Sequence, residues 1–203
     1  MSAEAIALET ASIEREVLMT GIGGQGVQLA ARILALAATR EEREVMSLGT
    51  YGGTMRGGNT DATVVVGDGP LTTPPIVSSA WALLVMHPRF ADPLLAKLRK
   101  GGVALADEDL LEDPLDASCF RVVAVPATSI ARDVDSPRAA SLVLLGAFAA
   151  LTGIVGSASL EAALASALPS YRQDFLESNR RALIAGMEAL QAMDQPAWES
   201  GAA

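Results

Sequence analysis

The chain has very few of the side chains from which catalytic and metal centres are usually built. Its 203 residues include one cysteine, Cys119, and one histidine, His87. A single cysteine excludes an internal disulfide and any zinc site or iron–sulfur cluster that needs several thiolates of this chain. A single histidine excludes a histidine-rich metal site. We expect His87 to cap the end of a strand and Cys119 to be a small core residue, so neither a Ser-His-Asp triad nor a cysteine nucleophile is expected.

Basic residues are also scarce. Lysine and arginine together number 15 against 24 aspartates and glutamates, which gives a formal net charge of -9. This balance argues against a nucleic-acid partner, because phosphate backbones are bound by clustered basic side chains. The N-terminal residues include several glutamates and no basic segment followed by an apolar one, so no secretory signal is expected and the protein is assigned to the cytoplasm.

A stretch without charge, residues 139–160, is the segment to test as a membrane span. It contains several glycines and serines, and Ser136-Pro137 provides a helix start just before it. These features favour a buried helix that ends at Gly153 over a helix that crosses a membrane.

The composition is that of a globular chain with a large core. Hydrophobic residues make up 50% and charged residues 19% of the sequence. No repeat or long linker divides it, and its length suits one domain. We therefore expect a leader at 1–15, a single domain at 16–195 and a short tail at 196–203.

Apolar and β-branched runs alternate with helical patterns along the chain. Strands are expected at 17–20, 44–48, 62–66, 81–86, 103–106 and 121–125. Helices are expected at 25–38, 89–100, 138–151, 160–168 and from Tyr171, with Gly101 as a stop signal and Ser170 and Gln173 as a capping box. This order predicts an α/β fold with an open, mostly parallel, doubly wound (Rossmann-like) sheet, helices on both faces and a helical C-terminal part.

Glycine is concentrated in two segments around the first predicted helix. The first is the turn Gly21-Ile22-Gly23-Gly24-Gln25-Gly26, which stands between a strand and a helix as a dinucleotide fingerprint does. A helix that begins at such a turn offers free N–H groups to an anion. A nicotinamide cofactor also needs an acid near the end of the second strand, and the sequence there reads Ser47-Leu48-Gly49-Thr50. Binding of another anion or cofactor, or a purely structural turn, fits the residues better than NAD.

The second glycine-rich segment runs from 49 to 59 and includes Thr50, Tyr51, Arg56, Gly57 and Gly58. A guanidinium held among glycines can grip a phosphate or a carboxylate through two hydrogen bonds. The alternative is an ion pair between Arg56 and an acidic residue of this chain or of a neighbouring one.

Residues 67–69, Gly-Asp-Gly, match the start of a thiamine-diphosphate motif, in which an Asp and a later Asn hold magnesium. The chain has two asparagines, and neither stands about thirty residues further on. We interpret 67–69 as a turn, so no magnesium site is expected in this chain.

Taken together, the two glycine-rich segments and the strand from Thr63 resemble the gamma subunit of 2-oxoacid:ferredoxin (acceptor) oxidoreductases. The resemblance extends over residues 17 to about 190 and includes Val125-Pro126-Ala127-Thr128, Leu144-Leu145-Gly146-Ala147 and Asn179-Arg180-Arg181-Ala182. One departure is Gly53-Thr54, where the family usually has Pro-Glu, and this departure leaves the substrate subclass open.

The resemblance implies a role in oxidative decarboxylation of a 2-oxoacid to an acyl-CoA, with electrons passed to ferredoxin or a related acceptor. Such complexes use thiamine diphosphate, Mg²⁺ and [4Fe-4S] clusters, with coenzyme A as a substrate. The implied partners are thiamine-binding alpha- and beta-type subunits and a cysteine-rich, ferredoxin-like subunit. This chain would hold none of the cofactors alone and would help to form the coenzyme A interface.

The cofactor-binding candidates are therefore Gly21, Gly23, Gly24, Gln25, Gly26, Thr50, Tyr51, Arg56, Gly57 and Gly58, with no catalytic residue and no metal ligand in this chain. Two other functional classes stay open on the sequence. One is a free-standing nucleotide-binding oxidoreductase that takes NAD(P), and the other is a regulatory anion-binding module without an enzyme partner.

Overall fold

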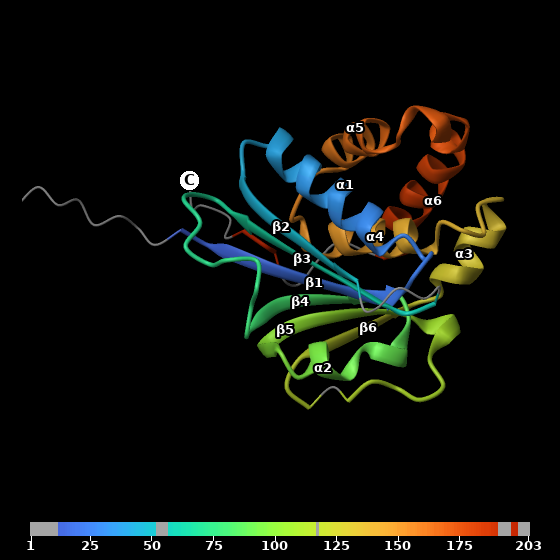
Figure 1. Cartoon of the computed structure of the whole chain (residues 1–203). Helices are drawn as coiled ribbons and strands as arrows, with labels where there is room; N and C mark the ends of the chain where they lie inside the picture. The colour runs from blue at the N-terminus through green and yellow to red at the C-terminus, as the bar shows by residue number, and fades with distance from the viewer. Residues whose placement is uncertain (1–11, 52–56, 117, 191–195, 199–203) are drawn as a thin grey trace, which may run out of the picture.

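The computed structural model describes residues 12–51, 57–116, 118–190 and 196–198. These residues form one six-stranded sheet in the order β2-β3-β1-β4-β5-β6 (Figure 1). The strands are β1 (Glu14–Ile22), β2 (Glu44–Tyr51), β3 (Asn59–Gly67), β4 (Ala80–Val85), β5 (Leu98–Asp107) and β6 (Arg121–Val125). β1, β4, β5 and β6 pair in parallel, and β3 is antiparallel to both of its neighbours. The predicted α/β class with an open, mostly parallel sheet is confirmed.

The two faces of the sheet are covered unequally. Figure 1 shows four helices stacked over one face: α1 (Val27–Arg40), α4 (Ala140–Thr152), α5 (Ser157–Ala167) and α6 (Leu176–Ala189). Among the described residues, the other face carries the four-residue α2 (Asp92–Leu95), the short 3-10 turns η1 (Pro88–Phe90) and η2 (Glu108–Leu110) and loops. A smaller apolar cluster, which includes Leu18, Val65 and Leu83, fills that side. Helices do lie on both faces, but most of the core lies between the sheet and the four-helix layer.

The centre of the helical layer is α4, which accounts for the uncharged run in the sequence. Eleven of its thirteen residues are buried, and it ends at Gly153 in a left-handed conformation with φ of 57°. Two glycines let its backbone approach that of α6 closely, because a Cβ at Gly146 would be driven into the Leu183 carbonyl and one at Gly186 into the Val143 carbonyl. Among the described residues no helix has the length and apolarity to cross a membrane.

One predicted helix is wrong. The pattern at 89–100 gives only η1 and α2, and Leu98 already belongs to β5. Gly101, with φ of 78°, does not end a helix but lies inside β5, where the register with β4 shifts between Ala80 and Ala82. A Cβ at Gly102 would lie 2.7 Å from the Trp81 carbonyl oxygen. The two glycines therefore mark a strand irregularity at a close backbone approach, which local sequence does not distinguish from a helix stop.

Two smaller expectations are also corrected. The predicted helix from Tyr171 starts as the 3-10 segment η3 (Ser170–Phe175), and α6 begins only at Leu176. No side chain caps η3, and the Gln173 amide instead donates to the Leu168 carbonyl at 2.9 Å, so the capping box is absent. Cys119 is exposed and not in the core. Its carbonyl accepts a hydrogen bond from the Gly101 N–H at 3.1 Å, so its backbone contacts β5.

Residues 196–198 pack back onto the domain. Ala197 is fully buried, and its N–H donates to the Thr152 carbonyl at 2.7 Å. The indole N–H of Trp198 donates to the Ile154 carbonyl at 3.0 Å, and the Arg43 guanidinium lies 3.9 Å from the centre of its ring. These contacts tie the segment to the end of α4 and to the chain just before β2.

We predict that Gly186→Ala destabilises the protein, although alanine is the better helix former. The added methyl group forces α6 away from α4, and overpacking of this kind costs about 1–3 kcal/mol. Thermal unfolding followed by circular dichroism is expected to give a midpoint lower by several degrees, on the order of 2–4 °C per kcal/mol. Glu188→Ala, on the exposed side of the same helix, is the control. An unchanged or higher midpoint for Gly186→Ala would contradict the close-contact interpretation.

Candidate functional site

The site follows from the order of the strands. β1 and β4 are parallel neighbours, yet β1 leads into α1 on one face of the sheet and β4 leads into η1 and α2 on the other (Figure 1). A crevice opens between two parallel strands where the connections diverge in this way, outside their carboxyl ends. The predicted glycine turn lies there, directly after β1.

The turn is shaped by its own hydrogen bonds and by the approach of α4. Gln25 closes it, since its side-chain oxygen accepts from the Ile22 N–H at 2.9 Å while its own N–H donates to the Ile22 carbonyl at 3.2 Å. Gly24 and Gly26 have φ of 103° and 87°, values that side chains rarely adopt. A Cβ at Gly26 would also lie 2.6 Å from the Ser141 hydroxyl. No side chain caps α1, so its first N–H groups stay available at the crevice.

The second glycine-rich segment meets this turn. The Gly23 N–H donates to the Gly58 carbonyl at 2.9 Å, and Gly57 has φ of 79°. The two segments are therefore brought together. Thr50 and Tyr51 belong to β2 and not to a loop, and Arg56 lies outside the described residues.

A polar network centred on Asp61 supports both segments, and no local sequence pattern predicts it. The two carboxylate oxygens of Asp61 accept from the Thr20 hydroxyl at 2.7 Å and from the Asn59 amide at 2.8 Å. Its carbonyl accepts from the Gln28 amide at 2.7 Å. The side-chain oxygen of Asn59 is buried and has no hydrogen-bond partner among the described residues. Asp61 thus ties β1, β3 and α1 together beneath the turn.

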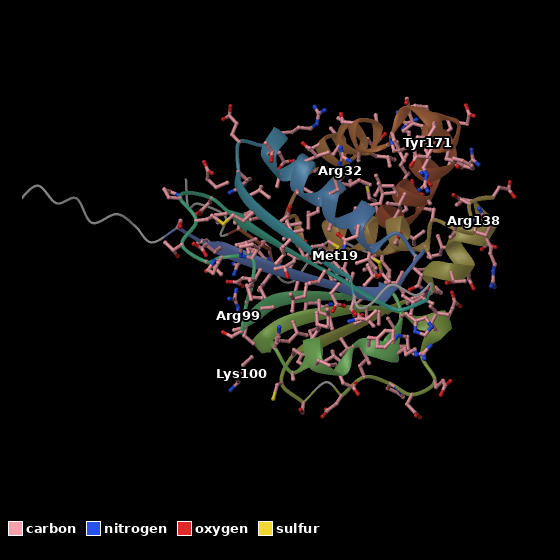
Figure 2. All side chains as sticks on the ribbon, in the orientation of Figure 1. Met19, Arg32, Arg99, Lys100, Arg138 and Tyr171 are labelled. Carbon is pink, nitrogen blue, oxygen red and sulfur yellow. The ribbon has the colours of Figure 1, made fainter. Side chains whose placement is uncertain are left out.

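In the part of the chain that the structure describes, three hollows border Gly24, and the two larger ones both have Arg172 on their rim. One, of about 370 Å³, lies between the turn and the start of β3 and has Arg172 on its rim. The other, of about 290 Å³, lies between α1, α4 and η3 and has Arg138 and Arg172 on its rim, with an apolar wall that includes Leu29, Leu142 and Phe175. Figure 2 shows Arg138 at the carboxyl edge of the sheet, opposite the edge that carries Arg99 and Lys100. Two exposed guanidinium groups therefore flank a helix N-terminus.

Asp107, at the carboxyl end of β5, is a buried carboxylate in the position of a possible catalytic base, but its oxygens already accept hydrogen bonds from this chain. It is 2% exposed, and its oxygens accept from the Thr128 hydroxyl at 2.6 Å and from the Thr128 N–H at 3.2 Å. Asp109 binds the Ser129 N–H at 2.7 Å in the same way. The two aspartates cap the start of α3 (Ala127–Asp133), whose own preceding residue, Pro126, supplies no cap. Their role is structural.

The described residues do not assemble a complete active site. They include no group of three histidine, cysteine, aspartate or glutamate side chains placed to hold a metal. His87 follows β4 and its Nδ1 accepts from the Arg89 N–H at 3.2 Å, which is the capping role predicted for it. The Asp68 carboxylate accepts from the Ile13 N–H at 2.7 Å, a contact between segments far apart in the sequence. What the crevice offers is backbone N–H groups, positive charge and an apolar wall, the requirements for holding an anionic ligand.

Known proteins match the chain over nearly all of its described domain. The family model Pyruvate ferredoxin/flavodoxin oxidoreductase matches residues 16–189. The 2-oxoglutarate synthase subunit KorC of Methanocaldococcus jannaschii is 31% identical over 184 residues, which cover 89% of this chain and 96% of that protein.

Solved structures agree with these matches. The gamma subunit of the keto/oxoacid ferredoxin oxidoreductase from Geobacter sulfurreducens PCA is 34% identical, with a TM-score of 0.75 over 87% of this chain and 95% of that one. The 2-oxoglutarate:ferredoxin oxidoreductase from Magnetococcus marinus, solved with 2-oxoglutarate, coenzyme A and succinyl-CoA bound, has a TM-score of 0.78 over 90% of this chain and 32% of that one. At 18% identity this last likeness shows the fold alone.

We predict that Asp107→Ala lowers stability without removing a catalytic group. It leaves the Thr128 hydroxyl and N–H without their buried acceptor, a loss of about 1–3 kcal/mol. Urea unfolding is expected to shift to lower midpoints, whereas Asp113→Ala, on the exposed loop before β6, is expected to change little. Unaltered unfolding of the Asp107 variant combined with lost turnover in the holoenzyme would instead make Asp107 catalytic.

Proposed function

The chain belongs to the pyruvate ferredoxin/flavodoxin oxidoreductase family as a gamma subunit of a 2-oxoacid:ferredoxin oxidoreductase, and we propose that within its complex it supplies part of the coenzyme A site. The observation that carries this proposal is the crevice at Gly21–Gly26. It combines free N–H groups of α1 with Arg138 and Arg172 and contains no catalytic constellation among the described residues. Such a chain positions an anionic substrate for chemistry done elsewhere.

The hollows around Gly24 suit the parts of coenzyme A. Its phosphates are the anionic groups that guanidinium side chains and a helix N-terminus would hold. Its pantetheine arm and adenine are less polar, and the wall formed by Leu29, Leu142 and Phe175 offers them apolar surface. Bound coenzyme A and succinyl-CoA in the Magnetococcus enzyme lend the proposal support by analogy.

Within the predicted set, we assign Gly23, Gly24 and Gly26 to backbone contact with the ligand, because they line the hollows. Gly21 and Gln25 shape the turn instead, through close packing and the hydrogen bonds described above. Gly58 does both, since it lines the same hollow as Gly23 and its carbonyl accepts the Gly23 N–H. Thr50, Tyr51, Arg56 and Gly57 are kept as candidates on the resemblance, with Arg56 holding either a phosphate or an acidic residue of a partner.

The cofactors of the reaction are proposed to reside on partner chains. The described residues contain no group of three histidine, cysteine, aspartate or glutamate side chains placed to hold a metal ion, and the Asp68 carboxylate accepts a hydrogen bond from the Ile13 N–H. Thiamine diphosphate, Mg²⁺ and the [4Fe-4S] clusters would therefore come from thiamine-binding subunits and a cysteine-rich, ferredoxin-like subunit of a cytoplasmic complex. The identity of the 2-oxoacid is left to those partners.

A free-standing NAD(P)-dependent oxidoreductase is the less favoured function. In the dinucleotide fold an acid at the end of the strand beside β1 binds the ribose. Here β3 takes that place, and both carboxylate oxygens of its Asp61 already accept hydrogen bonds. Calorimetric titration of the chain with NAD, NADP and FAD separates the two functions, since tight binding of any of them would favour the alternative.

We expect the tagged chain, recovered without oxygen from the cells that make it, to bring down a thiamine-binding chain and a cysteine-rich chain in fixed ratio. Native mass and subunit composition are the measurements. A chain recovered consistently without such companions would refute its role as a subunit of this enzyme.

In the assembled complex, Arg138→Ala and Arg172→Ala are each expected to raise the KM for coenzyme A roughly 10-fold or more, because a hydrogen bond to a charged group contributes about 1.5–3 kcal/mol. The KM for the 2-oxoacid is expected to stay unchanged. Lys100→Ala, at the opposite edge of the sheet in Figure 2, is the control for loss of a positive charge.

Arg56→Ala belongs in the same series. A raised KM for coenzyme A would place Arg56 on the phosphate, and loss of assembly would place it on a partner chain. Unchanged coenzyme A dependence of all three arginine variants would refute the proposed anion site.

A further inference from the structure

The outer edge of β2 is an interaction surface that the proposed function does not use. In the sheet β2 pairs only with β3, and the pairing runs without interruption from Glu44 to Tyr51. Proteins usually protect such edges with lysines, prolines, bulges or short strands. β2 has eight residues, no bulge, and Glu44 as its one charge. The opposite edge, β6, is only five residues long.

Two exposed apolar side chains lie on this edge and share one face of the sheet. Met46 is 42% exposed and Leu48 is 39% exposed. They lie opposite Val65 and Thr63 of β3, and Val65 belongs to the apolar cluster on the face away from α1. The small α2 covers β4 and β5 and leaves this part of the face open (Figure 1).

The other face of the edge carries a groove. Ser47 and Gly49 line it from β2, and Arg32, Ala35 and Leu36 line it from α1, around a volume of about 330 Å³. Figure 2 shows Arg32 on the outer side of α1. The β2 side of the groove is lined by the small residues Ser47 and Gly49, and the α1 side carries longer side chains, including Gln28, Arg32 and Leu36.

We propose that this edge joins two copies of the chain, with their β2 strands paired antiparallel about a two-fold axis through Ser47. The two sheets then become one. The proposal rests on the β2 edge, of which Thr50 and Tyr51 are also coenzyme A candidates, and its tests change only Met46, Ser47 and Leu48, which are not.

The sequence of β2 is complementary to itself in this register. Residues directly opposite in an antiparallel pair point to the same face, so Met46 of each copy meets Leu48 of the other and the four side chains form one apolar cluster. Glu44 then lies opposite Thr50, and no like charges face each other. An axis through Met46 would place Glu44 against Leu48, and one through Leu48 would place Met46 against Thr50. Those two registers pair Met46 or Leu48 with its own copy but leave the other apolar side chain opposite a polar or charged one, whereas the Ser47 register gives both of them apolar partners.

The first test is the mass of the purified full chain by analytical ultracentrifugation. We expect a concentration-dependent species of twice 20.9 kDa. Met46→Glu and Leu48→Lys, each alone, are expected to raise the dimer Kd about 10-fold or more, because a charge replaces an apolar contact on both sides of the axis. The double variant places opposite charges against each other twice and is expected to recover most of the affinity.

The recovery is specific to the Ser47 register. Both positions are exposed, so the variants are expected to keep the thermal midpoint of the parent, and this is measured alongside. A monomer at all concentrations up to about 100 μM, well above the Kd of a stable interface, would overturn the proposal. A dimer Kd that the single substitutions leave unchanged would also overturn it, as would a double variant whose dimer Kd is higher than that of both single variants.

Cysteine pairing gives the second test, in the complex as isolated from cells. On a Cys119→Ser background, Ser47→Cys places two thiols at the axis, where opposed Cα atoms are about 4.5–5.5 Å apart and a disulfide between the copies is expected. Met46→Cys is the matched control, because its two thiols are offset along the strands. Equal cross-linking of both variants, or cross-linking of Ser47→Cys to a different subunit, would refute the proposal.

Discussion

The candidate site depends on a glycine, Gly26, at the point where α1 meets α4, because no side chain fits there. Gly26 begins α1 in a left-handed conformation, and the Ser141 hydroxyl of α4 occupies the space that a Cβ would need. The approach fixes the first turn of α1 beside the first turn of α4, so that Arg138, just before α4, comes to lie next to Gly24. The position of α4 is set in turn by its glycine contacts with α6. The close α4–α6 and α1–α4 contacts thus determine where the residues around the crevice lie.

The polar residues near the crevice are already occupied, and this separates scaffold from binding surface. Asp61 lies near the start of β3 and Asp107 ends β5, so both lie at the carboxyl edge, where catalytic carboxylates often lie. Each has its oxygens filled by hydroxyl, amide or backbone donors of this chain. Groups left open at the crevice are cations and backbone N–H groups. Such groups suit the proposed anion site, and they fit a subunit whose reaction is completed by its partners.

The sequence predicted what is encoded locally. All six strands were expected near their observed positions, and Gly21–Gly26 was identified as the turn between the first strand and the first helix. What it missed depends on distant residues. Arg138 and Arg172 border the same hollow only because α4 and η3 both pack near the start of α1. Asp61 acts through Thr20 and Gln28, more than thirty residues earlier. Gly101 had the local signature of a helix stop, and only the neighbouring β4 makes it part of a strand.

The insertion of β3 between β1 and β2 is the step that an apolar pattern does not reveal, because parallel and antiparallel strands share the same alternation. It has two consequences. By running back along β1, β3 starts at the carboxyl edge and brings Gly58 to the glycine turn, which builds the site. By taking the place beside β1, it moves β2 to the outer edge, where half of its backbone groups have no partner within the sheet. The topology that completes the crevice therefore also exposes a strand, and a subunit that retains such an edge with a single charge and no bulge is suited to bury it against another chain.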